Sequence, residues 1–361
     1  MISIDRGLLG KGQLGDVIER HRRYGEFIDR LDIVVFSPKG YNDFKLSEKV
    51  STYPTSSPTK VQRIFDAIRI GKKLCSQTKY DLIIAMDPFF TGFVATRLKK
   101  KFGVKFLVHF HGDFWSNRLN PGMKMLSRYV VGRADAVRVM SEGQRKSLTT
   151  AGVADRKINI ISTPVDLQKF IDVSDKNVSK NVAQQTVLHV GRYDEVKDFL
   201  TLGRAWNIVA QKYPGTSFFQ VGGGRKALQE IRDGGFVSIP DSDVLERSTH
   251  EELLQYYGGT NVVVLSSRSE SFGKVLVEAN ACGKPVISTA TTGAKEIIQD
   301  GVNGYLVPIG DAQALANKII YLLENPDVAI KMGERGRELV KEKFGNNTEK
   351  IIQLWLKVSD V

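Results

Sequence analysis

Short apolar runs alternate with longer, helix-like stretches along almost the whole of this 361-residue chain. The runs are rich in β-branched and aromatic residues and lie at 32–36, 82–86, 106–110, 136–140, 158–161, 187–190, 217–221, 262–265 and 285–288. Strands that alternate with helices in this way form parallel sheets with helices packed on their faces. The sequence therefore predicts an α/β fold.

A polar stretch without clear periodicity, residues 171–186, separates these runs into two sets. We interpret it as a linker between an N-terminal domain, 1–170, and a C-terminal domain, 187–340. The chain is long enough for two domains of ordinary size. The last segment, 341–361, has the apolar spacing of an amphipathic helix.

The cysteine content and the lack of long apolar segments indicate the cellular compartment of the protein. Two cysteines, Cys75 and Cys282, are too few for a disulfide framework and lack the spacing of metal ligands. No window approaches the ~20 apolar residues of a membrane span, and the N-terminus lacks a signal-peptide pattern. We expect a protein of the reducing cytoplasm, either free or peripheral at the cytoplasmic membrane face.

Basic residues are concentrated in the first half of the chain. Residues 1–170 contain 30 Lys and Arg against 16 Asp and Glu, whereas residues 171–361 contain 22 against 24. Much of the excess lies at 20–23, 60–73 and 99–105, interleaved with apolar residues such as Phe65. Segments of this kind lie on anionic lipid headgroups; the alternative is a solvated basic surface. No nucleic-acid motif accompanies them, so we expect no nucleic-acid partner.

Two carboxylates, Glu270 and Glu278, are separated by eight positions after the apolar run 262–265. A helix beginning near Phe272 would direct its unpaired N–H groups toward the preceding loop and bind a diphosphate. Glu278 would then lie about 7.5 Å along that helix, with its side chain leaning back toward the N-terminus. It could reach a ribose hydroxyl. The alternative is an ordinary surface glutamate, which the apolar neighbours of Glu278 argue against.

Two cations follow the run 187–190. Arg192 and Lys197 would lie at the carboxyl edge of a parallel sheet, where they could stabilise the charge of a leaving diphosphate. His111 follows the run 106–110 and should also lie at a sheet edge. Gly12 belongs to a glycine-containing loop that precedes a predicted helix.

The segment from Arg268 to Ile287 resembles the signature of the family 4 retaining glycosyltransferases, in which a Glu-x7-Glu pair precedes a Gly-Lys-Pro-Val turn. The likeness continues through Gly293, Glu296 and Asn303-Gly304, and Arg192 with Lys197 is similar to the Gly-Arg-x4-Lys element of the family. The resemblance covers essentially the whole chain, less closely in the first third. It implies a GT-B fold, in which two Rossmann-like doubly wound domains face each other across a cleft and the final helix crosses back to the first domain.

The resemblance also implies roles for these residues. Glu270 would contact the hydroxyls of the donor sugar and, with His111, act in catalysis. Donor binding would fall to Gly12, Arg192, Lys197, Phe272, Gly273, Lys274 and Glu278. The adjacent Gly-Gly pair of the family is absent around Gly12.

The expected function is hexosyl transfer from a nucleotide sugar, UDP- or GDP-linked, to a glycan or lipid-linked acceptor in envelope polysaccharide or glycolipid synthesis. No cofactor is expected and, since no Asp-x-Asp site accompanies the motifs, no metal. A nucleotide-sugar epimerase of the same fold is the alternative. The sequence lacks the glycine fingerprint of a Rossmann oxidoreductase, which argues against that class. A non-catalytic subunit would be expected to have lost Glu270, Lys197 or Arg192, and all three are present.

Overall fold

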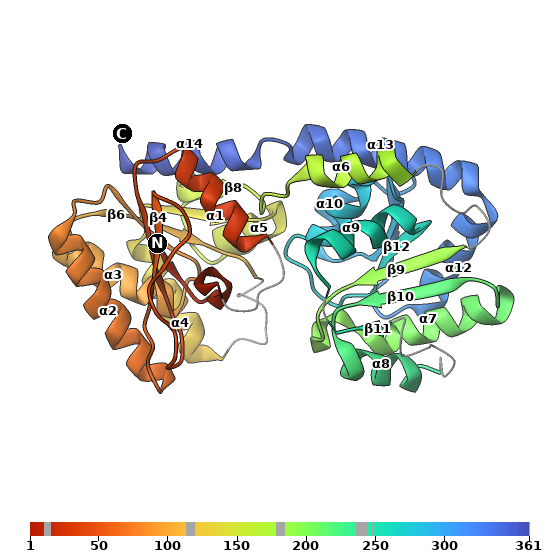
Figure 1. Cartoon of the computed structure of the whole chain (residues 1–361), viewed down its shortest axis with the longest axis horizontal. Coiled ribbons are helices and arrows are strands. Elements are labelled where there is room, and N and C mark those ends of the chain that lie inside the picture. The colour runs from red at the N-terminus through yellow and green to blue at the C-terminus, as the bar shows by residue number, and fades with distance from the viewer. Residues whose placement is uncertain (11–15, 113–119, 178–184, 236–243, 247, 361) are drawn as a thin grey trace. The chain divides into compact units, whose positions relative to one another are not determined.

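The computed structural model describes residues 1–10, 16–112, 120–177, 185–235, 244–246 and 248–360. The chain forms two compact units (Figure 1). Unit 1 comprises residues 1–162 and 346–361, and unit 2 comprises residues 163–345.

Unit 1 contains a sheet whose strands, as far as the described residues show, run in the order β3-β4-β2-β1-β5-β6-β7-β8. All neighbours pair in parallel except β3 with β4. The strands are β1 (Ile2–Ser3), β2 (Leu31–Val35), β3 (Phe44–Lys45), β4 (Val50–Pro54), β5 (Leu82–Ala85), β6 (Lys105–His109), β7 (Ala136–Val139) and β8 (Ile158–Ile160).

Helices cover both faces of this sheet because successive strand residues point to opposite sides. One apolar core lies under α2 (Lys60–Gln77), α3 (Phe90–Phe102), α4 (Pro121–Arg133) and α5 (Glu142–Thr150). A second core lies under η1 (Arg6–Leu9), α1 (Val17–Glu26) and the C-terminal α14 (Asn347–Ser359). A short turn of helix, η2 (Asp155–Lys157), precedes β8.

Unit 2 contains a parallel sheet in the order β11-β10-β9-β12-β13-β14. The strands are β9 (Thr186–Val190), β10 (Ser217–Val221), β11 (Val244–Leu245), β12 (Val262–Leu265), β13 (Val286–Thr289) and β14 (Gly304–Val307). The chain winds outward in one direction from β9 to β11 and then in the other from β12 to β14. The point where the winding reverses lies between β9 and β12, and open α/β sheets bind ligands at the carboxyl ends of the strands there.

The helices of unit 2 pack on both faces of its sheet. The main apolar core includes Trp206 against Phe218, with ring centroids 4.9 Å apart, and α6 packs on α9 and α10. The helices are α6 (Leu167–Asn177), η3 (Glu195–Lys197), α7 (Phe199–Lys212), α8 (Gly224–Asp233), α9 (His250–Gly259), α10 (Lys274–Ala281), α11 (Thr292–Ile297), α12 (Ala312–Glu324) and α13 (Pro326–Phe344).

The predicted α/β class with parallel sheets is confirmed, but the units divide the chain at other residues than we expected. Unit 1 ends at Ser162 rather than at 170, because α6 packs on helices of unit 2. The first part of the expected linker, 171–177, belongs to α6, and residues 178–184 lie outside the described ranges. The expected final helix begins later than 341, since α13 ends at Phe344 and α14 then returns to unit 1. None of the helices in the described ranges has the length and apolar content of a bilayer span.

Candidate active site

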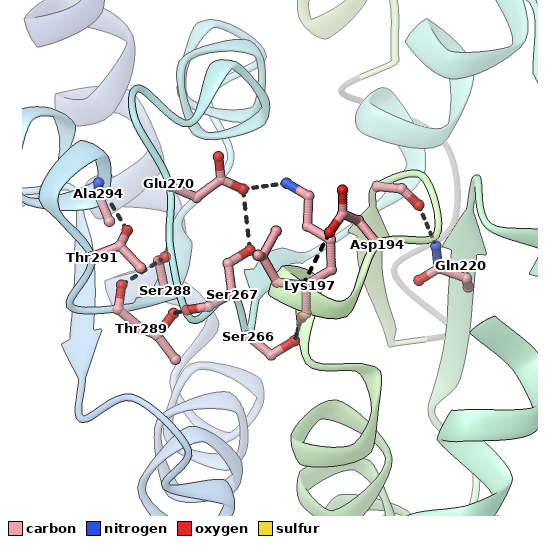
Figure 2. Close-up of polar contacts among 12 residues, drawn as sticks. Asp194, Lys197, Gln220, Ser266, Ser267, Glu270, Ser288, Thr289, Thr291 and Ala294 are labelled. Atoms are coloured by element: carbon pink, nitrogen blue, oxygen red, sulfur yellow. Dashed lines mark hydrogen bonds and ion pairs between the residues drawn. The ribbon is translucent and has the colours of Figure 1, made fainter. Parts of the chain in front are cut away.

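The predicted donor residues of unit 2 gather where the winding of its sheet reverses. Lys197 lies in η3, shortly after β9, and Glu270 lies in the loop after β12. Figure 2 shows their side chains pointing toward each other from these two loops. This is the position that the topology of the sheet favours for a ligand.

An ion pair joins Lys197 to Glu270. The ammonium donates to Oε1 of Glu270, which also accepts a hydrogen bond of 3.1 Å from the Ser267 hydroxyl. Only 17% and 15% of the two side chains is exposed, so water screens the pair less than it would on an open surface. The structure therefore holds a cation and an anion together at the carboxyl edge of the unit 2 sheet. The cation is suited to phosphate groups and the anion to hydroxyl groups.

Several further bonds fix these two loops against each other. The Ser266 hydroxyl donates to the carbonyl of Lys197 at 2.7 Å, and the Arg268 amide donates to the Val196 carbonyl at 2.7 Å. Asp198 accepts from Nε of Arg268 at 2.9 Å and caps α7. Burial raises the pKa of Asp198, but the hydrogen bonds from Arg268 and Thr201 outweigh it and leave that pKa below its usual value. The loop geometry is thus determined independently of any ligand.

The backbone of Glu270 is anchored to a third loop. Its carbonyl accepts a hydrogen bond of 2.7 Å from the amide of Gly293, at the start of α11. A Cβ atom at Gly293 would lie 2.5 Å from the Phe272 amide nitrogen, so only glycine allows this approach. This contact gives Gly293, which the sequence singled out only by resemblance, a physical role in positioning Glu270.

Glu278 lies on α10 and is buried, with 4% of its surface exposed. The Tyr257 hydroxyl donates to its Oε2 at 2.8 Å, and the Lys274 ammonium lies 3.3 Å from its Oε1. Burial, together with the charge of Glu278, raises the pKa of Tyr257 well above its usual value and keeps the phenol a donor. Tyr257 was not predicted, because it lies 21 positions before Glu278 on another helix and no local pattern marks it.

The start of α10 differs from the prediction by two residues. Gly273, with φ of 87°, is the N-cap, and the helix begins at Lys274 rather than near Phe272. A left-handed backbone of this kind favours glycine. Phe272 is buried, and its ring packs against Phe344 with centroids 5.4 Å apart. The Phe272 side chain is therefore part of the packing of unit 2, and its predicted part in donor binding stays a prediction.

A buried polar pair supports the loop that carries Arg192. The side-chain amide of Gln220 donates to the carbonyls of Gly191 and Gly222 at 3.1 and 2.6 Å. Its Oε1 must then accept from Nδ1 of His189, 2.5 Å away. Burial and the Lys197 charge lower the pKa of His189 to about 3. Neither residue was predicted to belong to the site.

Arg192 itself is exposed, and its side chain has no hydrogen bond or ion pair with any residue in the described ranges. The glycines after β10 lie close to it: a Cβ atom at Gly222 would lie 2.7 Å from the carbonyl oxygen of Gly191. Gly222 and Gly223 both have φ of 90°, in the region that favours glycine. The loop is therefore closely packed on one side, while the guanidinium remains free to bind an anion.

His111 lies in unit 1, two residues after β6, and is exposed. Its ring contacts that of the buried His109 edge to face, with centroids 5.7 Å apart. The carbonyl of the following Gly112 accepts from the Gln144 side chain at 3.0 Å. The carboxyl-edge position predicted from the sequence is thus observed. Gly12 lies outside the described residues.

The assembled groups of unit 2 are suited to a nucleoside diphosphate joined to a polyhydroxyl group. Arg192, Lys197 and the first backbone amides of α10 can donate hydrogen bonds to an anion. The two carboxylates can accept hydrogen bonds from hydroxyl groups. No three His, Cys, Asp or Glu side chains within the described ranges are grouped so that they could hold a metal ion.

Two family models match consecutive parts of the chain. The one described as Glycosyltransferase Family 4 matches residues 26–169, and the one described as Glycosyl transferases group 1 matches residues 171–339. The chain belongs to the family 4 glycosyltransferases. The family predicted from the Glu270 and Glu278 segment is therefore confirmed.

Curated relatives of this glycosyltransferase are distant. An uncharacterised glycosyltransferase of Haemophilus influenzae is 25% identical over 86% of each chain. N-acetyl-alpha-D-glucosaminyl L-malate synthase of Bacillus anthracis is 27% identical over 69% of this chain and 66% of its own. The relatives thus support a glycosyltransferase without identifying the sugar or the acceptor.

Solved structures of similar fold confirm the GT-B architecture. Sucrose-phosphate synthase from Thermosynechococcus elongatus matches with a TM-score of 0.83 and 23% identity, over 99% of this chain and 98% of its own. HepE from Anabaena, solved in complex with UDP-glucose, matches with a TM-score of 0.75 and 20% identity over 98% of both chains. At sequence identities this low, the structural similarity shows the fold alone.

Proposed function

We propose that this family 4 glycosyltransferase is a retaining hexosyltransferase that moves a sugar from a nucleotide sugar to a glycan or lipid-linked acceptor. The observation that supports this most strongly is the pairing of Lys197 with Glu270 where the winding of the sheet reverses, in the loop that precedes the helix of the buried Glu278. A donor has a diphosphate, a ribose and a sugar, and each finds a chemically matched partner among these groups.

In this proposal the diphosphate binds to Lys197, Arg192 and the start of α10. Glu278, held by Tyr257, accepts hydrogen bonds from the ribose hydroxyls. Glu270 exchanges its bond with Lys197 for bonds with the sugar hydroxyls. The cations then stabilise the negative charge that grows on the diphosphate as its bond to the sugar breaks.

Transfer with retention requires the acceptor hydroxyl to form its bond on the face from which the diphosphate leaves. The bond from the anomeric carbon to the phosphate oxygen breaks, and the acceptor proton passes to that leaving oxygen. His111, exposed at the carboxyl edge of the unit 1 sheet, is the proposed catalytic residue of the acceptor side. Proton nuclear magnetic resonance of the product tests retention: an inverted anomeric configuration would contradict it.

We propose a UDP- or GDP-linked donor and an acceptor of the cell envelope. HepE was solved with UDP-glucose, and relatives include a lipopolysaccharide core biosynthesis glycosyltransferase of Rhizobium meliloti, 28% identical over 57% of this chain. The basic first half of the chain suits an anionic or lipid-linked acceptor at the cytoplasmic membrane face.

Activity without a metal ion is a further part of the proposal, since Arg192, Lys197 and the start of α10 supply positive charge next to the diphosphate. Assays after EDTA treatment test it. We expect unchanged turnover, whereas a loss of turnover that Mn²⁺ restores would contradict this part.

A thermal-shift screen of nucleotide sugars tests the donor. Binding stabilises a protein by RT ln(1 + [L]/Kd), or roughly 2.7 kcal/mol at a hundredfold excess over Kd, so a correct donor should raise Tm measurably. A glycosyltransferase should then release nucleoside diphosphate only when an acceptor is present. Release without any acceptor would favour the epimerase, and the absence of a shift with UDP-, GDP- and ADP-sugars alike would contradict the proposal.

A further inference from the structure

Basic residues far outnumber acidic residues on three neighbouring helices of unit 1. Helices α2, α3 and α4 cover the same face of the sheet, and they have five, four and three Lys or Arg residues. Their one acid is Asp66 on α2. The opposite face is covered by α1 and α14, whose five basic residues are accompanied by three acids. The excess of positive charge is therefore concentrated on the face of unit 1 that α2, α3 and α4 cover.

The three helices form a continuous surface. A Cβ atom at Gly71 of α2 would lie 2.7 Å from Leu98 of α3, and one at Gly92 of α3 would lie 2.5 Å from Val130 of α4. Small residues at these two points let neighbouring helices approach closely. Figure 1 shows α2 and α3 side by side in orange.

Large apolar side chains protrude among these cations. Phe65 on α2 is 67% exposed and Met125 on α4 is 72% exposed. Val61 precedes Phe65 by one helical turn and is also exposed, so both lie on the same side of α2. By contrast, the neighbouring Ile64 and Ile68 pack against the core. The surface therefore combines positive charge with large apolar side chains that are mostly exposed.

Most of this charge is not neutralised locally. Asp66 already pairs with Arg69 at 3.0 Å and accepts from the Ser57 hydroxyl, and Lys99 pairs with Asp135. Lys72 and Lys73 on α2 are exposed, and no carboxylate in the described ranges pairs with either. A surface of this kind attracts an extended anionic partner.

We infer that the outer surface of α2, α3 and α4 docks on an anionic lipid bilayer. Phosphate headgroups would neutralise the cations, while Val61, Phe65 and Met125 would enter the boundary between headgroups and acyl chains. A nucleic acid would satisfy the charges but not the protruding apolar side chains. The inference rests on the proposed function only for its purpose, which is to bring the enzyme to a lipid-linked acceptor.

Vesicle flotation of the full-length protein tests the inference directly. We expect binding to phosphatidylcholine vesicles that contain about a third phosphatidylglycerol, no binding to phosphatidylcholine alone, and release at high salt. Lys72→Gln with Lys73→Gln should weaken binding roughly 30-fold, at about 1 kcal/mol for each cation near the surface. Arg23→Gln with Lys357→Gln removes the same charge from exposed positions on α1 and α14 and should change binding far less.

A tryptophan at the surface separates insertion from charge attraction alone. Phe65→Trp should show a blue shift in emission on adding the anionic vesicles, and Ile330→Trp, at a position on α13 that is 58% exposed, should show none. Absence of flotation, equal weakening by both double variants, or binding to DNA in preference to vesicles would each overturn the inference. Because these assays need no donor, an enzyme that turns over donor but ignores vesicles would refute this inference alone. One that binds vesicles but no donor would refute the proposed function instead.

Discussion

Contacts within unit 2 hold Glu270 in place without any bound ligand. Its carboxylate is held by Lys197 and Ser267, and its carbonyl by Gly293, so both ends of the residue are fixed. The sequence could predict Glu270 and Lys197, because each follows a strand-like run within a few residues and both match motifs of the family. It could not predict Tyr257 or Gln220, since their roles depend on partners from distant elements.

Replacing Glu270 tests its proposed part in transfer. Glu270→Gln keeps the shape and the acceptor for Ser267 but removes the charge, and we expect kcat to fall by roughly 10² to 10³. The variant leaves the mostly buried Lys197 ammonium without its charged partner, so we also expect a lower unfolding temperature, and kcat should be compared at a temperature where both proteins are folded. Glu334→Gln, at an exposed position on α13, is the control. Steady-state kinetics that give the same kcat for both variants would contradict the role.

Removing the Tyr257 hydroxyl tests whether it positions Glu278. Tyr257→Phe leaves a buried carboxylate with one partner fewer, a loss of about 1–3 kcal/mol. If Glu278 binds the donor ribose, KM for the donor should rise roughly tenfold while kcat changes little. Tyr321→Phe, at an exposed position on α12, is the control. A fall in kcat with unchanged KM would argue against donor positioning.

At the scale of elements, the buried strands were the most predictable. The run at 262–265 coincides with β12, because a strand covered on both faces is continuously apolar. Among the strands that were missed are β4 and β14. Polar residues and a proline interrupt the first, and the second begins at Gly304. The end of α6 was also missed, because it lies in the polar segment that we expected to be a linker. Packing on α9 and α10 stabilises this helix although that polar segment lacks clear periodicity.

Helix α13 offers a test of packing between elements. A Cβ atom at Gly333 would lie 1.9 Å from the carbonyl oxygen of Gly283, so Gly333→Ala must push α13 away from the turn after α10. We expect a loss of about 3 kcal/mol and a fall in Tm of roughly 6 to 12 °C. Gly132→Ala on α4 meets nothing within 4 Å and should stabilise by about 0.5–1 kcal/mol. Calorimetry that gives both variants the same Tm would contradict this packing.

At the scale of the whole molecule, buried histidines link folding to pH in both units. Burial lowers the pKa of His21 in unit 1 and of His189 in unit 2 to about 3, and it also lowers the pKa of His109. Well above pH 6.5 these residues are neutral whether the chain is folded or unfolded. Below that value only the unfolded chain takes up protons, so each histidine should lower the free energy of unfolding by about 1.4 kcal/mol per pH unit.

Thermal unfolding between pH 7.5 and 4.5 tests this linkage. We expect Tm to be nearly constant above pH 6.5 and to fall steadily below it. His21→Leu should flatten the decline of unit 1, because it removes one group that the unfolded chain protonates. A decline of the same steepness in this variant would show that other groups cause the acid sensitivity.

The architecture of the whole chain followed from the alternation of strands and helices together with the family motifs, and the family models and similar folds confirm it. The sequence did not indicate where one unit passes into the other, since Ser162 and Asn346 lie in segments without a compositional break. Sugar and acceptor specificity lies outside the shared motifs, so it was not predictable from them.

The measurement that tests the central claim most directly is calorimetric titration of the nucleotide sugar selected by thermal shift into the wild-type enzyme and into Lys197→Met. Lys226→Met, on α8, serves as the control. We predict saturable binding of one donor per chain, weakened at least tenfold by the loss of Lys197 and hardly affected by the control. Equal affinity in Lys197→Met and wild type would contradict a donor site where the winding of the unit 2 sheet reverses.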